Sequence, residues 1–377
     1  MVIAVTGGGS GALCALLQTP GASRSILEAT VPYSLASLAD WIGGEPDQAC
    51  SEATARAMAM AAFVRARRLA PEVDVQVLLG IGCTASLATN RPKRGERRVH
   101  LAIQRSDRSY VARYSLEHYP ADRSEDDRNT TELILSGVAL SCNVYHQPWK
   151  LLTPTGHGVG APDEQVELLL GTKKRIVLQA ESDVDYFNEE DMPPIPLLFP
   201  GAFNPRHAGH VRMAEIAEQK IGAAVTWELS VTNVDKPPLD YITIDERVEA
   251  LRLADPRHLI ALTRAPTFRE KAALFPEATF IVGADTLQRI AEPRYYGDNA
   301  AQRDEAIGEI ARRRCRFLVF GREVGGKFVT LSDLNLPVQL RSLCDDVAPE
   351  EFRDDVSSTA LRKGDLQSFD PRSLTEG

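Results

Sequence analysis

The stretch between residues 195 and 210 constrains the fold of this chain more than any other. It begins with the apolar run Ile195 to Phe199, which predicts a buried strand, and continues through a turn that contains Gly201. His207 and His210 follow three residues apart, so they share one face of the helix expected to begin there. The backbone N–H groups at a helix N-terminus are free to meet an anion. The stretch therefore predicts a strand, a tight turn and a helix start, an arrangement that suits a polyphosphate.

This stretch resembles the signature GxFNPxHxGH of the nucleotidylyltransferase superfamily, most closely that of its nicotinamide and nicotinate mononucleotide adenylyltransferases. The matching residues are Gly201, Phe203, Asn204, Pro205, His207, Gly209 and His210. The resemblance implies a Rossmann-like, doubly wound parallel α/β sheet in which nucleotides bind at the carboxyl ends of the strands. It further implies that the two histidines contact the triphosphate, and that the nucleotide is bound by Gly201, Phe203, Asn204 and Gly209.

A second segment, residues 356–362, resembles the ISSTxxR element of the same superfamily. Ser357, Ser358 and Thr359 are residue types that cap helices, and their hydroxyls and the following amides can form an anion nest. Arg362 lies one turn further on, where its guanidinium could bind phosphate oxygens. Alone, such a run is more often only a helix cap. The order and distance of the two motifs favour a shared phosphate site.

Weaker matches lie between the two motifs. Lys236 follows the strand-like residues 224–229, and the resemblance implies that it reaches the phosphates, although a loop lysine is usually a solvated charge. Gly283 and Asp285 end another apolar run and would line the nucleotide pocket, but a strand-end turn capped by aspartate is an equally good interpretation. Arg322 follows a further buried run and would face the same crevice.

The implied reaction is adenylyl transfer from ATP to a pyridine mononucleotide, with release of pyrophosphate. Because such a reaction depends on positioning and charge neutralisation, the residues expected to donate to the triphosphate are His207, His210, Lys236 and Arg362. Magnesium would bind mainly through the phosphates and water, so no set of protein metal ligands is expected. Three alternatives are another phosphorylated acceptor, CTP in place of ATP, and a non-catalytic pyridine-nucleotide sensor.

Composition narrows the expected partners and compartment. The apolar share of 44% and the charged share of 25% are typical of a globular protein, and a net charge of −9 argues against nucleic-acid binding because it repels a polyanion. Six cysteines without a CxxC pair favour reduced thiols and a cytoplasmic location. No apolar stretch approaches the ~20 residues of a membrane span, and the N-terminus does not resemble a signal peptide. We therefore expect neither a membrane nor a nucleic acid as a partner, while a homo-oligomer is compatible with these features.

The 377 residues allow two or three domains, and the sequence favours two, both of the α/β class. The acidic segment 183–194, which ends in two prolines, predicts a linker. It would separate a first domain at 1–182 from a second domain at 195–377.

Apolar runs alternate with helical stretches in the first domain, as expected of an α/β fold. The runs are 73–79 and 99–103, and the helical stretches are 51–69 and 128–143. The opening segment Gly7 to Ala12 also fits the dinucleotide-binding pattern G-x-G-x-x-A, with Glu28 as the acid about twenty residues on. That pattern is loose, and we do not favour a dinucleotide-binding fold.

Over about residues 1–145, the first domain resembles the CinA C-terminal family, which is associated with nicotinamide mononucleotide deamidase activity. The matching elements, in order, are Thr6-Gly7-Gly8, Pro20-Gly21-Ala22-Ser23, Val31-Pro32-Tyr33-Ser34, Ser51-Glu52-Ala53-Thr54-Ala55 and Gly80-Ile81-Gly82. That family carries a lysine shortly after the tyrosine, but residues 34–41 contain none, so Ser23 lacks an activating group nearby in the sequence. We therefore expect a relic domain that binds a ligand or only packs, with little deamidation.

Overall fold

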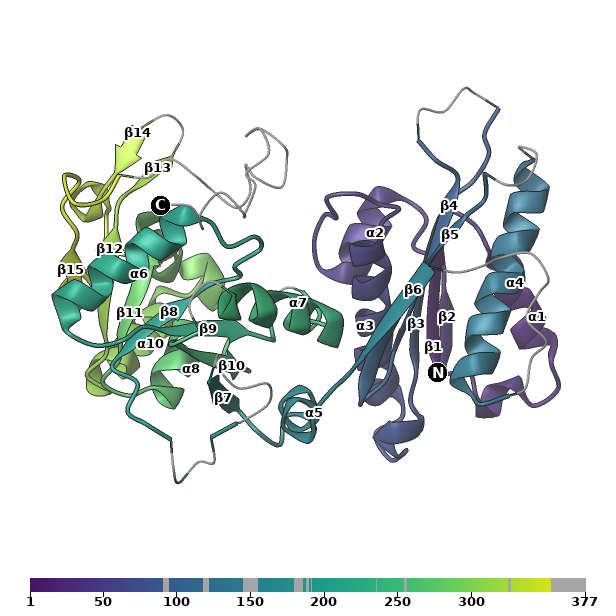
Figure 1. The fold of residues 1–377 in the computed structure, drawn as a ribbon, viewed down its shortest axis with the longest axis horizontal. Helices are drawn as coiled ribbons and strands as arrows, with labels where there is room; N and C mark the ends of the chain where they lie inside the picture. Colours follow the sequence, from purple (N-terminus) through teal and green to yellow (C-terminus); the bar gives the residue numbers. More distant parts are fainter. Residues whose placement is uncertain are drawn as a thin grey trace. The chain divides into compact units, whose positions relative to one another are not determined.

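In the computed structural model of the chain, the described residues are 1–90, 95–117, 122–144, 155–179, 186–187, 190, 192–234, 236–253, 256–324 and 327–353. They form two compact units, and Figure 1 labels most of their helices and strands. The first unit comprises Met1–Thr172 and Thr232–Asp245, and the second comprises Lys173–Val231 and Glu246–Gly377. Each contains one large sheet with helices, so the predicted α/β class is confirmed.

The first unit is built on a six-stranded mixed sheet in the order β2-β1-β3-β4-β5-β6. Its strands are β1 (Val2–Thr6), β2 (Glu28–Thr30), β3 (Gly80–Ser86), β4 (Arg98–Gln104), β5 (Arg108–Ser115) and β6 (Thr155–Gly160). β1 is parallel to β2 and β3, and the remaining pairs are antiparallel. The helices are α1 (Ser10–Gln18), α2 (Leu35–Ile42), α3 (Glu52–Leu69), α4 (Arg123–Ser141) and α5 (Asp163–Leu170).

Alternation along β1 divides the core of this unit between the two faces of the sheet. Ile3 and Val5 pack in the cluster that includes α1 and α4, whereas Val2 and Ala4 pack against α2 and α3. Figure 1 shows these helix pairs on opposite faces. Gly82 allows α3 to approach closely, because a Cβ at this position would lie 2.4 Å from the carbonyl oxygen of Ala55.

Most of the elements predicted for this unit are present. The run 99–103 lies within β4, and the helical stretches 51–69 and 128–143 correspond to α3 and α4. The run 73–79 is wrong as a strand, because it holds the short 3-10 helix η2 (Val75–Val77) and leaves the Val77 side chain 65% exposed. The strand begins only at β3, where the glycines fit against α3.

The second unit is built on a seven-stranded sheet in the order β15-β12-β11-β8-β9-β10-β7. Its strands are β7 (Arg175–Gln179), β8 (Leu197–Pro200), β9 (Thr226–Ser230), β10 (Leu259–Thr263), β11 (Thr279–Gly283), β12 (Arg316–Phe320) and β15 (Cys344–Asp346). All neighbours are parallel except β7 and β10. From β10 to β15 the strands follow the 3-2-1-4-5-6 order of doubly wound nucleotide-binding sheets. The predicted Rossmann-like sheet is therefore confirmed.

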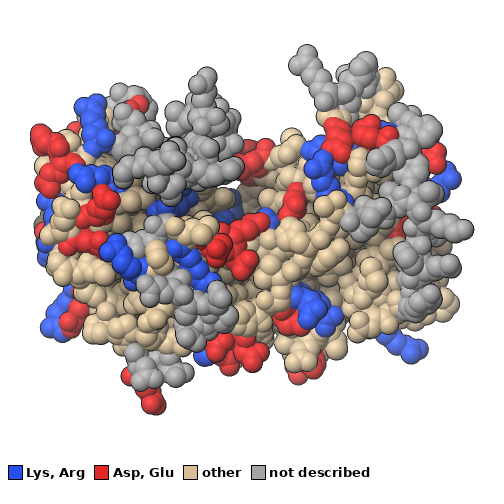
Figure 2. Space-filling model, in the orientation of Figure 1, with Lys and Arg blue, Asp and Glu red and all other residues tan. Residues whose placement is uncertain are grey.

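Helices flank this sheet, and a small hairpin follows β12. The helices are α6 (Ala208–Ile221), α7 (Tyr241–Arg252, of which only the residues from Glu246 on belong to this unit), α8 (Phe268–Leu274), α9 (Ala284–Ala291), α10 (Ala300–Arg312) and α11 (Val338–Arg341), and the hairpin is β13 (Arg322–Val324) with β14 (Lys327–Val329). Phe280, Phe317 and Val319 form a buried core with residues of α8, α9 and α10. No helix among the described residues has the length and apolar character that a membrane crossing requires. Figure 2 shows acidic and basic side chains interspersed over the face that it draws.

The division between the units differs from the predicted linker at 183–194. β7 already pairs with β10 of the second sheet, and the Phe187 N–H donates to the Val177 carbonyl at 2.9 Å. An acidic segment with two prolines indicates a loop, but it cannot show which sheet the preceding strand joins. In addition, residues 232–245, which the sequence placed in the second domain, belong to the first unit.

Residues 232–245 are held within the first unit by buried polar contacts. The Tyr241 N–H donates to Ser109 Oγ at 2.9 Å, and the Tyr241 side chain is buried. Arg56 Nη1 lies 3.6 Å from Asp240 Oδ1, and both of these side chains are also buried. The connection from β9 to α7 is therefore part of the packing of the first unit.

Candidate functional site

In the second sheet, the chain adds successive strands first on one side of β8 and then on its other side. β8 lies between β9 and β11; β9 and β10 extend the sheet to one side, while β11, β12 and β15 extend it to the other. The connections that leave β8 and β11 therefore run to opposite faces, which opens a crevice outside the carboxyl ends of these strands. The residues that follow β8, β11 and β12 are placed to form a binding site there.

A cavity of about 330 Å³ lies at these strand ends, within the size range of small-molecule sites. It is lined by residues from the ends of β8, β11 and β12 and from the first two turns of α6 and α9. The structure thus brings together six residues singled out in the sequence, namely Gly201, His207, Gly209, His210, Gly283 and Asp285, and it places Arg322 beside them.

The loop between β8 and α6 is tight because the Phe203 ring is folded beneath it. Phe203 has a φ of 45°, a left-handed conformation that few non-glycine residues adopt, and its side chain is buried. Gly201 accommodates that ring, because a Cβ there would lie 2.5 Å from Phe203 Cζ. The Gly201 N–H donates to the Glu228 carbonyl at 3.0 Å and fixes the loop to β9. The Asn204–Pro205 peptide bond is cis.

Aromatic rings pack beneath the cavity and surround His210. The Phe203 ring makes edge-on contacts with Phe199, Trp227 and His210, at centroid distances of 5.5, 5.1 and 5.3 Å. Trp227 stacks on Phe199 at 5.2 Å. These apolar faces exclude water from one side of the imidazole, which disfavours its charged form.

His210 is a neutral hydrogen-bond donor in this setting. Burial, followed by the charges of His207, Arg322 and Arg206, lowers the pKa of His210 to about 3. The ring is therefore neutral at pH 7. Its Nδ1 accepts the His207 backbone N–H at 3.2 Å, so the single ring proton must lie on Nε2.

His207 occupies the N-cap position of α6 and stacks on His210. The centroids of the two imidazole rings are 3.8 Å apart, with 31° between their planes, and both rings line the cavity. Because α6 begins at Ala208, its first N–H groups and the positive end of its dipole lie at the same edge. This edge of the cavity is suited to an anionic group.

One carboxylate and two guanidinium groups form another part of the wall. Arg289 Nη2 donates to Asp285 Oδ2 at 2.8 Å, and Arg322 Nη1 lies 3.6 Å from Asp285 Oδ1. Gly283 leaves room for this carboxylate, since a Cβ there would lie 2.7 Å from Asp285 Oδ1. The three charged side chains carry a net charge of about +1 at neutral pH.

Other residues predicted for the site lie elsewhere. Phe203 is buried beneath the cavity and Asn204 is exposed, and neither lines it. Lys236 is also absent from the described lining; it belongs to the first unit, where a Cβ on Gly44 would lie 3.1 Å from Lys236 Cε. The cause is the anchoring of residues 232–245, which directs the loop after β9 into the first unit. Outside the described residues lie Ser357, Ser358, Thr359 and Arg362.

Arg289, Thr286 and Phe352 line the cavity without having been singled out in the sequence. Arg289 could have been found, because it lies four residues after Asp285 and thus on the same face of a helix that follows a Gly-x-Asp turn. Phe352 has no such local signal. It follows β15 and reaches the cavity by packing edge-on against Phe320, with ring centroids 5.1 Å apart.

In the first unit, a carboxylate of the chain itself occupies the start of α1. The Gly9 N–H donates to Asp127 Oδ1 at 2.7 Å. Gly7 has a φ of 81°, and a Cβ there would lie 2.0 Å from the Ala85 carbonyl oxygen. The glycine turn therefore packs tightly on its own unit, and the N–H of Gly9 is not available to a dinucleotide phosphate.

Ser23 shows no activating partner in the part of the chain that the structure describes. It lies exposed on η1 (Ala22–Arg24), and no hydrogen bond to its hydroxyl occurs among the residues that the structure describes. Tyr33 lines a cavity of about 680 Å³ together with Thr89 and Arg123, and the Arg123 Nη2 donates to the Tyr33 hydroxyl at 3.2 Å. Ser23 is not part of that described lining. A serine needs an adjacent base or cation to act as a nucleophile, so this arrangement gives no support to deamidation.

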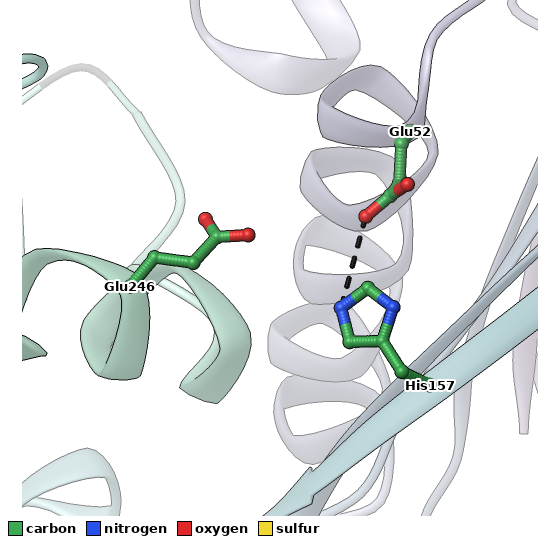
Figure 3. Close-up of side chains that lie close together, drawn as sticks. All are labelled: Glu52, His157 and Glu246. Atoms are coloured by element: carbon green, nitrogen blue, oxygen red, sulfur yellow. Dashed lines mark ion pairs between the residues drawn. The ribbon is translucent and has the colours of Figure 1, made fainter.

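Figure 3 shows a further ion pair of the first unit. Glu52 begins α3 and His157 lies on β6, with His157 Nε2 3.9 Å from Glu52 Oε1. Glu246, also drawn, belongs to the second unit. Glu52 and His157 are both solvent-accessible, so water screens the pair, and two such ligands do not by themselves make a metal site.

Residues 198–364 match the cytidylyltransferase-like family. The C-terminal half of the chain therefore contains a nucleotidyltransferase-superfamily domain, and the matched region includes every residue that lines the 330 Å³ cavity. A solved structure of a competence-damaged protein (CinA) superfamily protein from Escherichia coli is similar to 37% of this chain and 78% of that chain, at 17% identity and a TM-score of 0.31. A similarity of that size carries no argument, so the resemblance of the first unit to the CinA family remains a prediction. No curated protein sequence matches the chain.

Proposed function

We propose that the second unit transfers AMP from ATP to nicotinamide or nicotinate mononucleotide, a step of NAD biosynthesis. The observation that carries this proposal is His210, a neutral Nε2 donor held in a cavity at the strand ends of a nucleotidyltransferase domain. A donor of this kind suits a reaction in which negative charge moves between phosphate oxygens.

In the proposed reaction, a phosphate oxygen of the mononucleotide attacks the α-phosphorus of ATP in line. A new P–O bond forms, the bond from the α-phosphorus to the bridging oxygen breaks, and pyrophosphate leaves with the electron pair. No bond to the protein is formed, so the chain contributes positioning and electrostatic stabilisation.

His210 serves this step as a donor and not as a general acid or base. Because its pKa is about 3, the imidazolium form is scarcely populated near neutral pH. We assign its Nε2–H to an oxygen that gains charge during transfer, either the bridging oxygen or an α-phosphate oxygen. His207 and the start of α6 would bind the adjoining phosphate oxygens.

Magnesium fits this site as part of the ATP complex and not as a resident ion. Asp285 is the one carboxylate among the described lining residues, and it is already engaged by Arg289 and Arg322. Mg²⁺ prefers six oxygen ligands and usually keeps several waters. We therefore assign the ion to phosphate oxygens and water, with the protein contacting the phosphates.

The acceptor rests on two associations. The Phe203-Asn204-Pro205 sequence resembles the pyridine mononucleotide branch of the superfamily, and the first domain resembles a family that acts on nicotinamide mononucleotide. The match to the cytidylyltransferase-like family favours one alternative, namely CTP as the donor with another phosphorylated acceptor. A nucleotide sensor would bind the same ligands without turnover.

Pyrophosphate release tests the proposal directly. The full chain would be incubated with magnesium, ATP or CTP, and each of nicotinamide mononucleotide, nicotinate mononucleotide, phosphopantetheine or no acceptor. We expect release with ATP and a pyridine mononucleotide only. Release with CTP or phosphopantetheine would reassign the substrates, and release with none of them would contradict a transferase of these substrates.

Ammonia release in the same samples tests the first unit. We expect none from nicotinamide mononucleotide, because the Ser23 hydroxyl has no base beside it among the described residues. Sustained release that disappears in Ser23→Ala would show that the first unit is an active deamidase.

A further inference from the structure

We propose that Arg289 is a phosphate-binding residue of the second unit and that Asp285 positions it. The inference deepens the proposed function and rests on it to this extent: the phosphate belongs to a substrate of the same cavity. Arg289 is not part of the signature motif; it lies on α9, four residues after Asp285.

The Arg289 guanidinium is fixed at the cavity wall by one turn of α9. Its Nη2 donates to Asp285 Oδ2 at 2.8 Å and lies 3.5 Å from Thr286 Oγ1, while its Nε lies 3.4 Å from the Asp285 carbonyl oxygen. The side chain lines the cavity and is 52% exposed, so a ligand can reach it from solvent. A guanidinium already held on one edge loses less conformational freedom when it binds an oxyanion on the other.

Asp285 does more than pair with a neighbour on its own helix. Its Oδ1 is buried and accepts no hydrogen bond from the residues that the structure describes, yet it faces Arg322 Nη1 at 3.6 Å. One carboxylate therefore holds two guanidinium groups, from α9 and from β13, at the same cavity. A simple surface i, i+4 pair needs neither the second arginine nor the buried oxygen.

The charge of this wall matches a phosphate. Two guanidinium groups against one carboxylate leave a net charge of about +1, and the neutral His210 ring adds none. A phosphate monoester or a polyphosphate presents paired oxygens that fit the guanidinium fork. The same chemistry could come from the phosphate of the acceptor mononucleotide or from the triphosphate tail of ATP.

Binding measurements on the full chain distinguish these sources. The ligands would be nicotinamide mononucleotide, ATP and inorganic pyrophosphate, with nicotinamide riboside and adenosine as phosphate-free partners, each measured by titration calorimetry. Loss of one charge-assisted contact is worth roughly a 10- to 100-fold weaker Kd. We expect Arg289→Gln to weaken the phosphate ligands by that factor and to leave the phosphate-free ligands unchanged.

Arg212→Gln is the matched control. Arg212 lies on α6 of the same unit, pairs with Glu215 at 3.3 Å, and is not among the described residues that line the cavity. Its removal should leave every Kd unchanged. Arg289→Lys keeps the charge but not the fork, so an intermediate loss is expected. A loss confined to nicotinamide mononucleotide would place the acceptor phosphate at Arg289, and a loss confined to ATP and pyrophosphate would place the triphosphate tail there.

The Asp285→Asn variant distinguishes two effects of Asp285, namely the positioning of the arginines and the electrostatic repulsion of a phosphate. If Asp285 aligns the arginines, this variant binds phosphate ligands more weakly although it removes a negative charge. Tighter binding would show that Asp285 only repels the ligand and would overturn its positioning role. Wild-type Kd values in Arg289→Gln, or a native chain that binds no phosphate ligand, would overturn the proposal for Arg289. A chain that binds phosphate through Arg289 but releases no pyrophosphate would support it and contradict the proposed function alone.

Discussion

Two substitutions of His210 separate its two hydrogen bonds. Its Nδ1 accepts the His207 N–H, and its Nε2 carries the proton that we assign to the reacting phosphates. An asparagine side chain reaches about as far as Nδ1 and can keep the cap, whereas a glutamine reaches about as far as Nε2 and can keep a donor. His210→Asn therefore preserves the helix start without the donor, and His210→Gln does the reverse.

The expected size of the effect follows from the charge state of the ring. With a pKa of about 3, only about one molecule in 10,000 carries imidazolium at pH 7, so what the Asn variant loses is a neutral donor. Removing one preorganised donor to a developing oxyanion costs on the order of 100- to 1,000-fold in turnover. We expect His210→Asn near the lower end of that range in kcat, with a small change in KM, because the contact strengthens mainly in the transition state. His210→Gln should lose roughly 10-fold less, since a donor remains in reach of the phosphates.

Steady-state pyrophosphate release at several pH values is the appropriate assay, with circular dichroism to verify that each variant is folded. His210 stays neutral between pH 5 and pH 9, so it should contribute no titration to the wild-type rate over that range. The pH dependence of the rate should therefore have the same shape in the wild type and in both variants. If His210→Asn is as active as His210→Gln, the ring acts only as a helix cap. If a titration near pH 6.5 is lost in both variants, His210 titrates normally and the donor argument fails.

Three further predictions concern stability. Lys271 Nζ donates to both carboxylate oxygens of Glu228 at 2.8 and 2.7 Å, and both side chains are buried. Lys271→Met should therefore lower the free energy of unfolding of the second unit by about 3–5 kcal/mol in urea, and adding Glu228→Gln should restore part of that loss. Burial, followed by Arg98 and Arg113, lowers the pKa of His100 to about 4, so only the unfolded chain gains this proton as pH falls from about 6.5 to about 4. Stability of the first unit should fall over that window, and less steeply in His100→Gln; equal slopes would contradict the shift. Residues 195–377 expressed alone lack β7 and expose Tyr241, so they should melt at a lower temperature or aggregate, whereas melting like the full chain would show that this part folds independently.

Local sequence could predict the parts of the site whose residues are close together in the sequence or lie at the ends of neighbouring parallel strands. β8, the loop after it and the start of α6 are consecutive in the sequence, so the site around Gly201 and His210 could be predicted locally. The carboxyl ends of parallel strands meet at one edge of the sheet, so Gly283 and Asp285 could be placed near them. Phe203 shows the limit of this reasoning, because a motif residue can serve by folding under the loop and not by touching a ligand.

The parts that sequence could not predict depend on long-range packing. Lys236 lies in the loop after β9, where a phosphate-binding lysine would be expected, yet Tyr241 and Asp240 hold that loop in the first unit. Similarly, β7 lies before a loop of linker composition, and only its pairing with β10 assigns it to the second sheet. The amino-acid composition of a segment indicates its local structure but not the strand or unit with which it pairs.

The pairing of β7 with β10 also limits how copies of this chain can associate. Without β7, the five-residue strand β10 would present unpaired N–H and C=O groups at the edge of the sheet, a template for a strand from another molecule. β7 covers that edge, and residues 186–187 cover part of β7 in turn. At the opposite edge, β15 has three residues and carries the exposed Asp345 and Asp346. Joining the second sheets of two copies edge to edge into a continuous ribbon is therefore disfavoured.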